Sequence, residues 1–142
     1  MLLPLIEKEI KKLLAAKIIV PLRCLKWVAN LVVVRKKSGE IKLRVDFRNL
    51  KKCSKKDNYP LPKMEHLLQK VLGARVMYFL DGFLGYNQVS LHLEDQEKTT
   101  FTTPWGTFMY SKITFGLMNA GATFQRAMDI AFAGEKDKFV LV

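Results

Sequence analysis

The 142-residue chain has 49% hydrophobic and 26% charged residues, a globular composition that excludes a disordered low-complexity tract, and its length allows one domain or a piece of one. Residues 1–56 hold 16 of the 24 Lys and Arg and 4 of the 13 Asp and Glu, a net charge of +12, which leaves −1 for residues 57–142. So basic a lobe repels itself unless a polyanion binds it, and we predict a nucleic-acid partner; a solvated basic face and a membrane surface are the alternatives.

Cysteines and the N-terminal residues exclude other classes of protein. Cys24 and Cys53 are the two cysteines, and without a CxxC motif or clustered His they indicate neither a zinc site nor a disulfide framework. The apolar start, residues 1–6, is too short for a secretion signal or a membrane span. We expect an intracellular protein, cytoplasmic or nuclear, that is not secreted and has no membrane partner.

The N-terminal region contains a helix pattern and then a hairpin pattern. Apolar residues at helical spacing predict a helix from Pro4 to about Lys17. Residues 27–37 and 41–47 resemble two strands about a Gly-containing turn, so a β-hairpin is expected. This hairpin contains five basic residues. Lys42 and Arg44 are on its polar face, and Arg35, Lys36 and Lys37 flank its turn.

The middle of the chain changes character twice. Residues 49–57 are a lysine-rich connector, and residues 59–62 are too rich in proline for a regular element. A helix is predicted from Pro62 to about Leu72, and its apolar face consists of Met64, Leu67, Leu68 and Val71. Residues 75–82 then form so apolar a run that we expect a buried strand that ends on a carboxylate.

The last third is predicted to contain strands followed by a helix. Residues 86–93 alternate as a strand, residues 94–98 form a polar turn, and residues 99–103 and 107–113 form a second hairpin. Asn119 or Thr123 is expected to cap a helix that runs to about Ala133, with Phe124, Met128 and Phe132 facing inward. A further apolar strand begins at residue 138. Hairpins mixed with separate helices favour an α+β fold over a doubly wound parallel sheet.

A carboxylate at the end of the predicted buried strand suggests metal-dependent phosphoryl transfer. Asp81 would be held rigidly at the edge of the sheet, and Gly82 would let the backbone approach a metal and a triphosphate. A turn residue or a helix cap is the alternative interpretation of Asp81.

Four sequence motifs, in order, resemble those of reverse transcriptases from gypsy-type LTR retrotransposons. Residues 80–89, LDGFLGYNQV, resemble the first catalytic motif, in which an aromatic residue follows the aspartate by five positions. Residues 115–125 resemble the next motif, residues 42–50 the fingers hairpin and its exit, and residues 57–62 the connector between fingers and palm. The resemblance implies a polymerase fingers–palm fragment with antiparallel hairpins and packed helices, in which about 1–60 are fingers and connector and about 61–142 are palm.

The resemblance implies an RNA-directed DNA polymerase that uses Mg²⁺, dNTP and an RNA or DNA template-primer in two-metal nucleotidyl transfer. Asp81 would be the catalytic residue and a metal ligand, and Tyr86 the aromatic residue under the sugar that rejects a 2′-hydroxyl. The other implied nucleotide-binding residues are Lys36, Lys42, Gly82, Phe115, Gly116 and Gln125. Contacts with nucleic acid are expected from Arg35, Lys37, Arg44 and Arg48.

The chain departs from the family pattern at several positions. Lys42 stands where arginine is common, and Thr114 and Gly121 stand where proline is usual. The paired aspartates of the family are expected beyond Val142, together with the rest of the palm, the thumb and RNase H as partners in a parent polyprotein. We therefore expect the isolated chain not to extend a primer and to be only marginally stable. A non-catalytic nucleic-acid-binding remnant and a degenerate fragment without activity are the alternatives.

Overall fold

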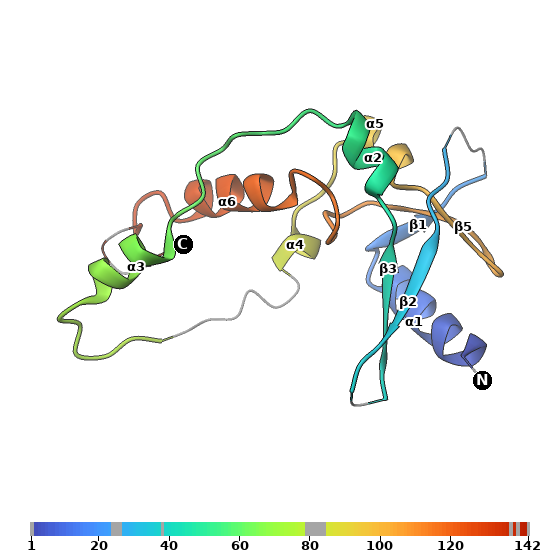
Figure 1. Ribbon diagram of the computed structural model, residues 1–142, viewed down its shortest axis with the longest axis horizontal. Helices are drawn as coiled ribbons and strands as arrows, with labels where there is room; N and C mark the ends of the chain where they lie inside the picture. The colour runs from blue at the N-terminus through green and yellow to red at the C-terminus, as the bar shows by residue number, and fades with distance from the viewer. Residues whose placement is uncertain are drawn as a thin grey trace.

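The helices and strands follow one another in a mixed order along the chain (Figure 1). The computed structural model describes residues 2–23, 27–37, 39–78, 85–136, 138 and 140–141. The elements are α1 (Leu3–Ala15), β1 (Ile19–Pro21), β2 (Leu31–Arg35), β3 (Ile41–Val45), α2 (Arg48–Cys53), α3 (Met64–Val71), α4 (Gly85–Gln88), α5 (Leu93–Gln96), η1 (Glu97–Thr99), β4 (Phe101–Thr103), β5 (Gly106–Tyr110) and α6 (Ala120–Ala131). The predicted α+β class is confirmed.

The strands form two antiparallel sheets. One sheet has the order β1–β5–β4, and Ile19 lies opposite Tyr110 in its register. The other is the hairpin of β2 and β3, in which Leu31 pairs with Val45 and Val34 with Lys42. Both predicted hairpins are therefore confirmed, and β1 joins the second one as a third strand.

The hydrophobic core lies between α1 and the two sheets. Buried side chains from all three layers form it: Ile6, Ile10, Ile18, Ile19, Ala29, Val45, Phe47, Phe101, Phe108 and Tyr110. Phe47 packs edge-on against Tyr110, with ring centroids 6.3 Å apart. Because β1 pairs with β5, segments before and after residue 60 share one core.

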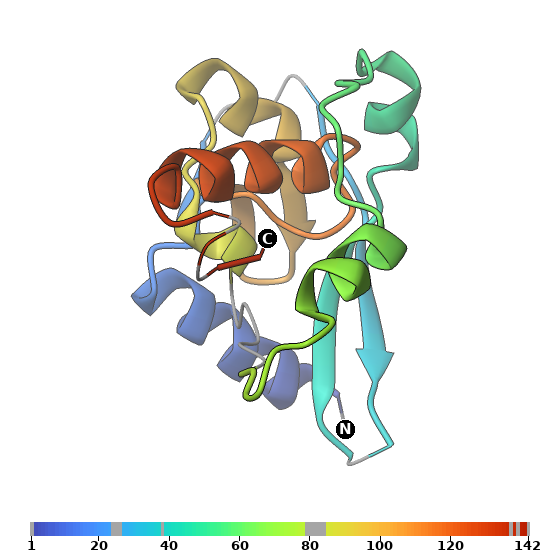
Figure 2. The ribbon, with the colours of Figure 1, turned by 90° about the vertical axis from the view of Figure 1, so that its left-hand side faces the viewer.

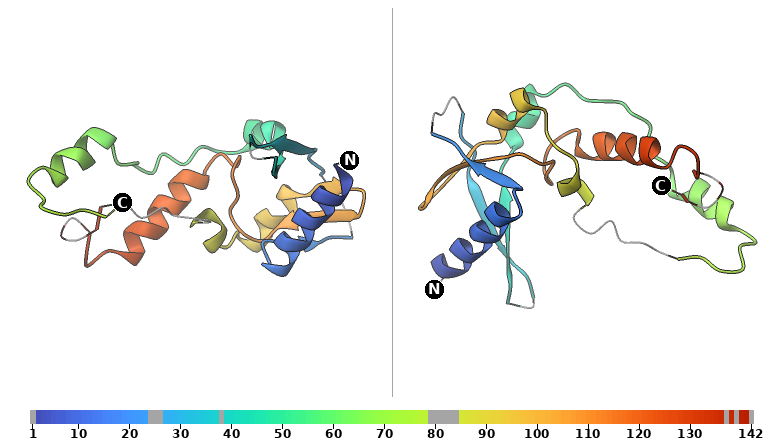
Figure 3. Two further views of the ribbon diagram at one scale, coloured as in Figure 1. Left: turned by 90° about the horizontal axis from the view of Figure 1, so that it is seen from below. Right: turned by 180° about the vertical axis from the view of Figure 1, so that it is seen from behind.

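The second half of the structure extends away from this core. In the views from below and from behind, α1 and the sheets occupy one end and α3 and α6 the other (Figure 3). The end-on view shows α6 and α3 in front of the sheets (Figure 2). The predicted helices at both places are confirmed, but the apolar face of α3 is uncovered: Met64 is 68% and Leu68 56% exposed.

Two predictions of strands are wrong in the described residues. Residues 75–78 form no strand, and Val76 is 70% and Tyr78 87% exposed. A strand needs a neighbour for its backbone groups, and none of the described strands lies beside these residues. The start of the predicted strand at 86–93 is instead the helical turn α4, and only the bridge between Ser90 and Lys112 retains strand pairing.

Other differences concern the polar segments. The lysine-rich connector begins as the helix α2, and the predicted polar turn at 94–98 forms α5 and η1. At the predicted strand 138–142, the described residues form one bridge, between Lys136 and Val140. The helix predicted from Asn119 is α6, with Asn119 at its N-cap position.

Candidate nucleotide and nucleic-acid interface

Tyr86 lies at the centre of an aromatic cluster built from three segments. Its ring meets Phe115 edge-on with centroids 4.8 Å apart, and Phe124 of α6 with centroids 5.2 Å apart. α4 can approach α6 this closely because residue 85 is glycine: a Cβ there would lie 2.9 Å from the ring of Phe124. The helical turn, rather than a strand, therefore presents Tyr86 between the two rings.

Phe115 connects this cluster to the β2–β3 hairpin. The Nζ of Lys42 lies 5.1 Å from the centroid of the Phe115 ring, a cation–π contact. The next residue, Gly116, has φ of +101°, and a Cβ there would lie 3.3 Å from Phe47, the N-cap residue of α2. The structure thus brings together Lys42, Tyr86, Phe115 and Gly116, which come from three separate sequence motifs.

The face of the hairpin next to Phe115 is both basic and apolar. The register places Lys42 and Arg44 beside Val34 and Val32, which are 39% and 44% exposed. Side chains alternate across a strand, so Arg35, opposite Ile41, lies on the other face of the hairpin.

Ion pairs involve two of the other predicted basic residues. Lys36 binds Glu40 across the hairpin turn at 3.0 Å, and Lys37 is exposed. Arg48 contacts both carboxylate oxygens of Asp46, at 2.6 and 3.0 Å. These hydrogen bonds lower the pKa of Asp46 and raise the pKa of Arg48.

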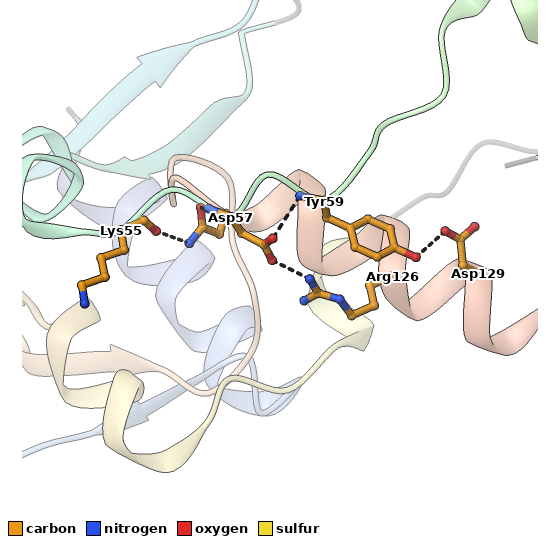
Figure 4. Close-up of polar contacts among 6 residues, drawn as sticks. Lys55, Asp57, Tyr59, Arg126 and Asp129 are labelled. Carbon is orange, nitrogen blue, oxygen red and sulfur yellow. Dashed lines mark hydrogen bonds and ion pairs between the residues drawn. The ribbon is translucent and has the colours of Figure 1, made fainter.

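Gln125 belongs to a hydrogen-bonded group on the face of α6 toward the connector, the segment of residues 54–63 between α2 and α3. Its Nε2 donates to Asp129 Oδ1 over 3.2 Å, one helical turn along α6. The hydroxyl of Tyr59 donates to Asp129 Oδ2 over 2.7 Å (Figure 4). Lys136 donates to Asp129 Oδ1. The Lys136 and Tyr59 hydrogen bonds hold the pKa of Asp129 below its usual range, and the bond to Asp129 raises the pKa of Tyr59.

A second set of contacts fastens the connector to α6. Arg126 binds Asp57 Oδ2 at 2.8 Å, and its guanidinium lies 4.5 Å from the centroid of the Tyr59 ring (Figure 4). Asn119 accepts from the Asp57 backbone N–H and donates to the Lys55 carbonyl, so it bridges to the connector instead of capping α6 with its side chain. Tyr59 was recognised in the sequence as part of a motif, but its partner Asp129 lies 70 residues away and no local pattern connects them.

The predicted metal ligand cannot be compared with these contacts. Asp81 and Gly82 are outside the described residues. Within the described ranges, no three His, Cys, Asp or Glu side chains gather as a metal site would require. No helix in those ranges combines the length and the apolar composition needed to cross a bilayer.

Comparisons with known proteins identify relatives over most of the chain. It is 35% identical over 130 residues to the retrovirus-related Pol polyprotein from transposon gypsy of Drosophila melanogaster, a match that covers 87% of this chain and 12% of that polyprotein. It is 33% identical over 129 residues to the enzymatic polyprotein of cauliflower mosaic virus (strain Strasbourg), with 89% and 19% covered. The chain therefore spans a small part of these relatives.

Solved structures show the same fold. The foamy viral protease-reverse transcriptase dRH in complex with double-stranded DNA superposes with a TM-score of 0.76, at 16% identity, over 98% of this chain and 24% of that chain. A second structure of the foamy viral enzyme with double-stranded DNA gives 0.75 at the same identity, over 98% of this chain and 29% of that chain. A profile of the family described as "Reverse transcriptase (RNA-dependent DNA polymerase)" matches residues 34–141. The chain therefore belongs to the reverse transcriptase family, as its resemblance to gypsy-type elements predicted.

Proposed function

We propose that this chain supplies the fingers and the first part of the palm of a retroelement RNA-directed DNA polymerase. Residues up to about 60 form the fingers and their connector, and the remainder belongs to the palm, except that β4 and β5 return to the fingers core. Family membership supports the polymerase activity, and the coverage of the relatives supports a role as one part of a larger Pol polyprotein.

The convergence of Lys42, Phe115 and Tyr86 carries this proposal. The Lys42 ammonium group of the hairpin lies over the Phe115 ring, which in turn packs against Tyr86 of α4. An ammonium neutralises phosphate charge, and aromatic rings contact the apolar faces of sugars and bases. A nucleoside triphosphate carries phosphates, a sugar and a base, so it is the ligand that we propose. Lys36, Gly116 and Gln125 are proposed as further contacts.

The proposed template-primer lies along the basic lobe. The foamy viral enzymes that share this fold were solved with double-stranded DNA, which supports a duplex partner here. We assign Arg35, Lys37, Arg44 and Arg48 to phosphate contacts, because the net +12 of residues 1–56 favours a polyanion.

Divalent metal chemistry is proposed for the complete polymerase. The described residues do not fit a Mg²⁺ ion by themselves, because no cluster of three ligating side chains exists among them. We propose that Asp81 supplies one carboxylate and that carboxylates elsewhere in the parent polymerase supply the others. Bound Mg²⁺ would stabilise negative charge on the transferring phosphate.

The test uses a polymerase that joins this chain to the remaining palm, thumb and RNase H segments. Tyr86→Val removes the ring that packs between Phe115 and Phe124, so incorporation of ribonucleotides relative to deoxyribonucleotides should rise roughly tenfold or more. Tyr86→Phe keeps the ring and should keep the discrimination. Steady-state kcat/KM for both nucleotide classes is measured on an RNA template.

Two outcomes contradict the proposal. Unchanged discrimination in Tyr86→Val would remove Tyr86 from the sugar site. A complete polymerase that binds nucleic acid in a salt-dependent manner but never extends a primer would favour the non-catalytic remnant.

A further inference from the structure

The Gln125 side chain is held in one orientation by the residue one turn along α6. Its Nε2 lies 3.2 Å from Asp129 Oδ1. A carboxylate only accepts hydrogen bonds, so the amide must turn its NH₂ group toward Asp129 and its carbonyl Oε1 away. Within the described residues, Oε1 receives no hydrogen bond. Gln125 therefore presents a free acceptor at a fixed position.

Asp129 is itself fixed from both sides. Its Oδ1 accepts from Gln125 and Lys136, and its Oδ2 accepts from the hydroxyl of Tyr59 at 2.7 Å. Its side chain is only 20% exposed, so these donors, rather than water, satisfy most of its lone pairs. A carboxylate bound by donors on both oxygens cannot rotate away without losing hydrogen bonds. The orientation of Gln125 thus depends on Asp129 and, through it, on Tyr59.

Tyr59 comes from the connector between the two parts of the molecule and is oriented there. Its backbone N–H donates to Asp57 Oδ1 over 3.0 Å, and its ring lies under the Arg126 guanidinium. Its hydroxyl reaches α6 across 70 residues of sequence. The position of the connector is therefore relayed to Gln125 by two hydrogen bonds.

We propose that Asp129 and Tyr59 are positioning residues that pre-orient the Gln125 carbonyl toward a hydrogen-bond donor of the nucleotide, such as a sugar hydroxyl or a base amino group. This inference rests on the proposed function, which places Gln125 beside the nucleotide. A side chain ordered before binding loses less conformational freedom when the ligand arrives, which strengthens binding. Neither Asp129 nor Tyr59 needs to touch the nucleotide.

The chain contains its own matched control. Asp57 and Arg126 also fasten the connector to α6, at 2.8 Å, but neither of them bonds to Gln125. Asp57→Asn weakens that ion pair, while an amide oxygen remains for the Tyr59 N–H. If the contacts only attach the connector, Asp57→Asn and Tyr59→Phe should behave alike; if they position Gln125, the two variants should differ.

The first measurement reads the Gln125 side chain directly in the 142-residue protein by ¹⁵N–¹H NMR. Tyr59→Phe and Asp129→Ala, which removes the acceptor of the Gln125 NH₂ group, should shift the Gln125 side-chain amide resonances and speed their exchange with water, whereas Asp57→Asn should leave them in place. Thermal melts of each variant confirm that it is folded. Unchanged Gln125 resonances in Asp129→Ala would overturn the proposal whether or not the polymerase proves active.

The second measurement uses the complete polymerase and the KM for dNTP. Asp129→Ala and Tyr59→Phe should raise this KM roughly 3- to 10-fold, the cost of ordering one side chain, with little change in kcat. Gln125→Ala should abolish the further effect of Asp129→Ala, because the two residues act through one contact. An equal rise in Asp57→Asn, or full additivity with Gln125→Ala, would overturn the positioning role. A polymerase without activity would refute the proposed function, and the NMR result would still decide the positioning.

Discussion

Gly116 illustrates how one residue joins two parts of the site. Its φ of +101° lies in the region that side chains with a Cβ rarely adopt, and the place where a Cβ would be is 3.3 Å from Phe47. The glycine therefore lets the Phe115 segment turn and pack against the end of β3. Phe115 can then lie under Lys42 and beside Tyr86.

We predict that Gly116→Ala lowers the free energy of unfolding by about 1–3 kcal/mol, through backbone strain and the contact with Phe47. Gly73→Ala is the control, since Gly73 also has positive φ, +90°, but has no atom within 4 Å of a Cβ position. Urea unfolding of both variants separates the two costs. An equal loss in both variants would show that Phe47 can move aside and that the contact does not matter.

At the scale of elements, the two faces of the β2–β3 hairpin differ in the side chains that they carry. One face, with Leu31, Val33, Ile41, Leu43 and Val45, packs toward the core. The other face presents Lys42 and Arg44 among exposed valines. A two-stranded hairpin is marginal alone, so α1 and the second sheet hold it in place.

We predict that Arg44→Gln weakens binding to a nucleic-acid duplex and makes it less salt-dependent. Loss of one phosphate contact should reduce the slope of log K against log salt by roughly 0.9. Lys98→Gln removes the same charge from the near-neutral part of the chain, so it should leave the slope unchanged. Fluorescence anisotropy over a salt series measures both slopes, and equal slopes for the two variants would point to net charge instead of this face.

At the scale of the whole molecule, the connector makes contacts at both of its ends. The chain leaves the core at Phe47. Asp57 and Tyr59 then bind Arg126 and Asp129 of α6 (Figure 4). The described residues of α3 beyond it contribute no buried side chain. The polar contacts with α6, rather than a continuous core, therefore hold the connector in place.

We predict that the hydrogen bonds of Asp129 and Asp46 make the free energy of unfolding fall at acid pH. The pKa values of Asp129 and Asp46 are lower in the folded state than in the unfolded state, because hydrogen bonds from Lys136 and Arg48 favour their charged forms. Their contribution is present above the unfolded pKa, about 4, and is lost as pH falls through the folded pKa.

Asp129→Asn should therefore flatten the fall in the free energy of unfolding below about pH 4, and Tyr59→Phe, which removes one donor, should flatten it less. Denaturant unfolding between neutral and acid pH measures this. An acid limb as steep in Asp129→Asn as in the original chain would show that other carboxylates dominate. Burial raises the pKa of the Tyr110 hydroxyl in the folded state. The contribution of Tyr110 to the free energy of unfolding is therefore present below its unfolded pKa and is lost as pH rises through the folded pKa.

The sequence by itself determined the elements whose signal is local. Helical spacing of apolar residues identified α1 and α6, strand alternation about turn residues identified the β2–β3 and β4–β5 hairpins, and the motifs indicated the reverse transcriptase family.

Only the tertiary structure decided the features that depend on distant partners. Residues 86–93 alternate, yet the approach of Gly85 to Phe124 selects a helical turn, because it seats Tyr86 between two rings. Residues 75–78 are apolar, but a strand forms only beside another strand. The hydrogen bond from Tyr59 to Asp129 spans 70 residues, and the folded chain alone brings its donor to its acceptor.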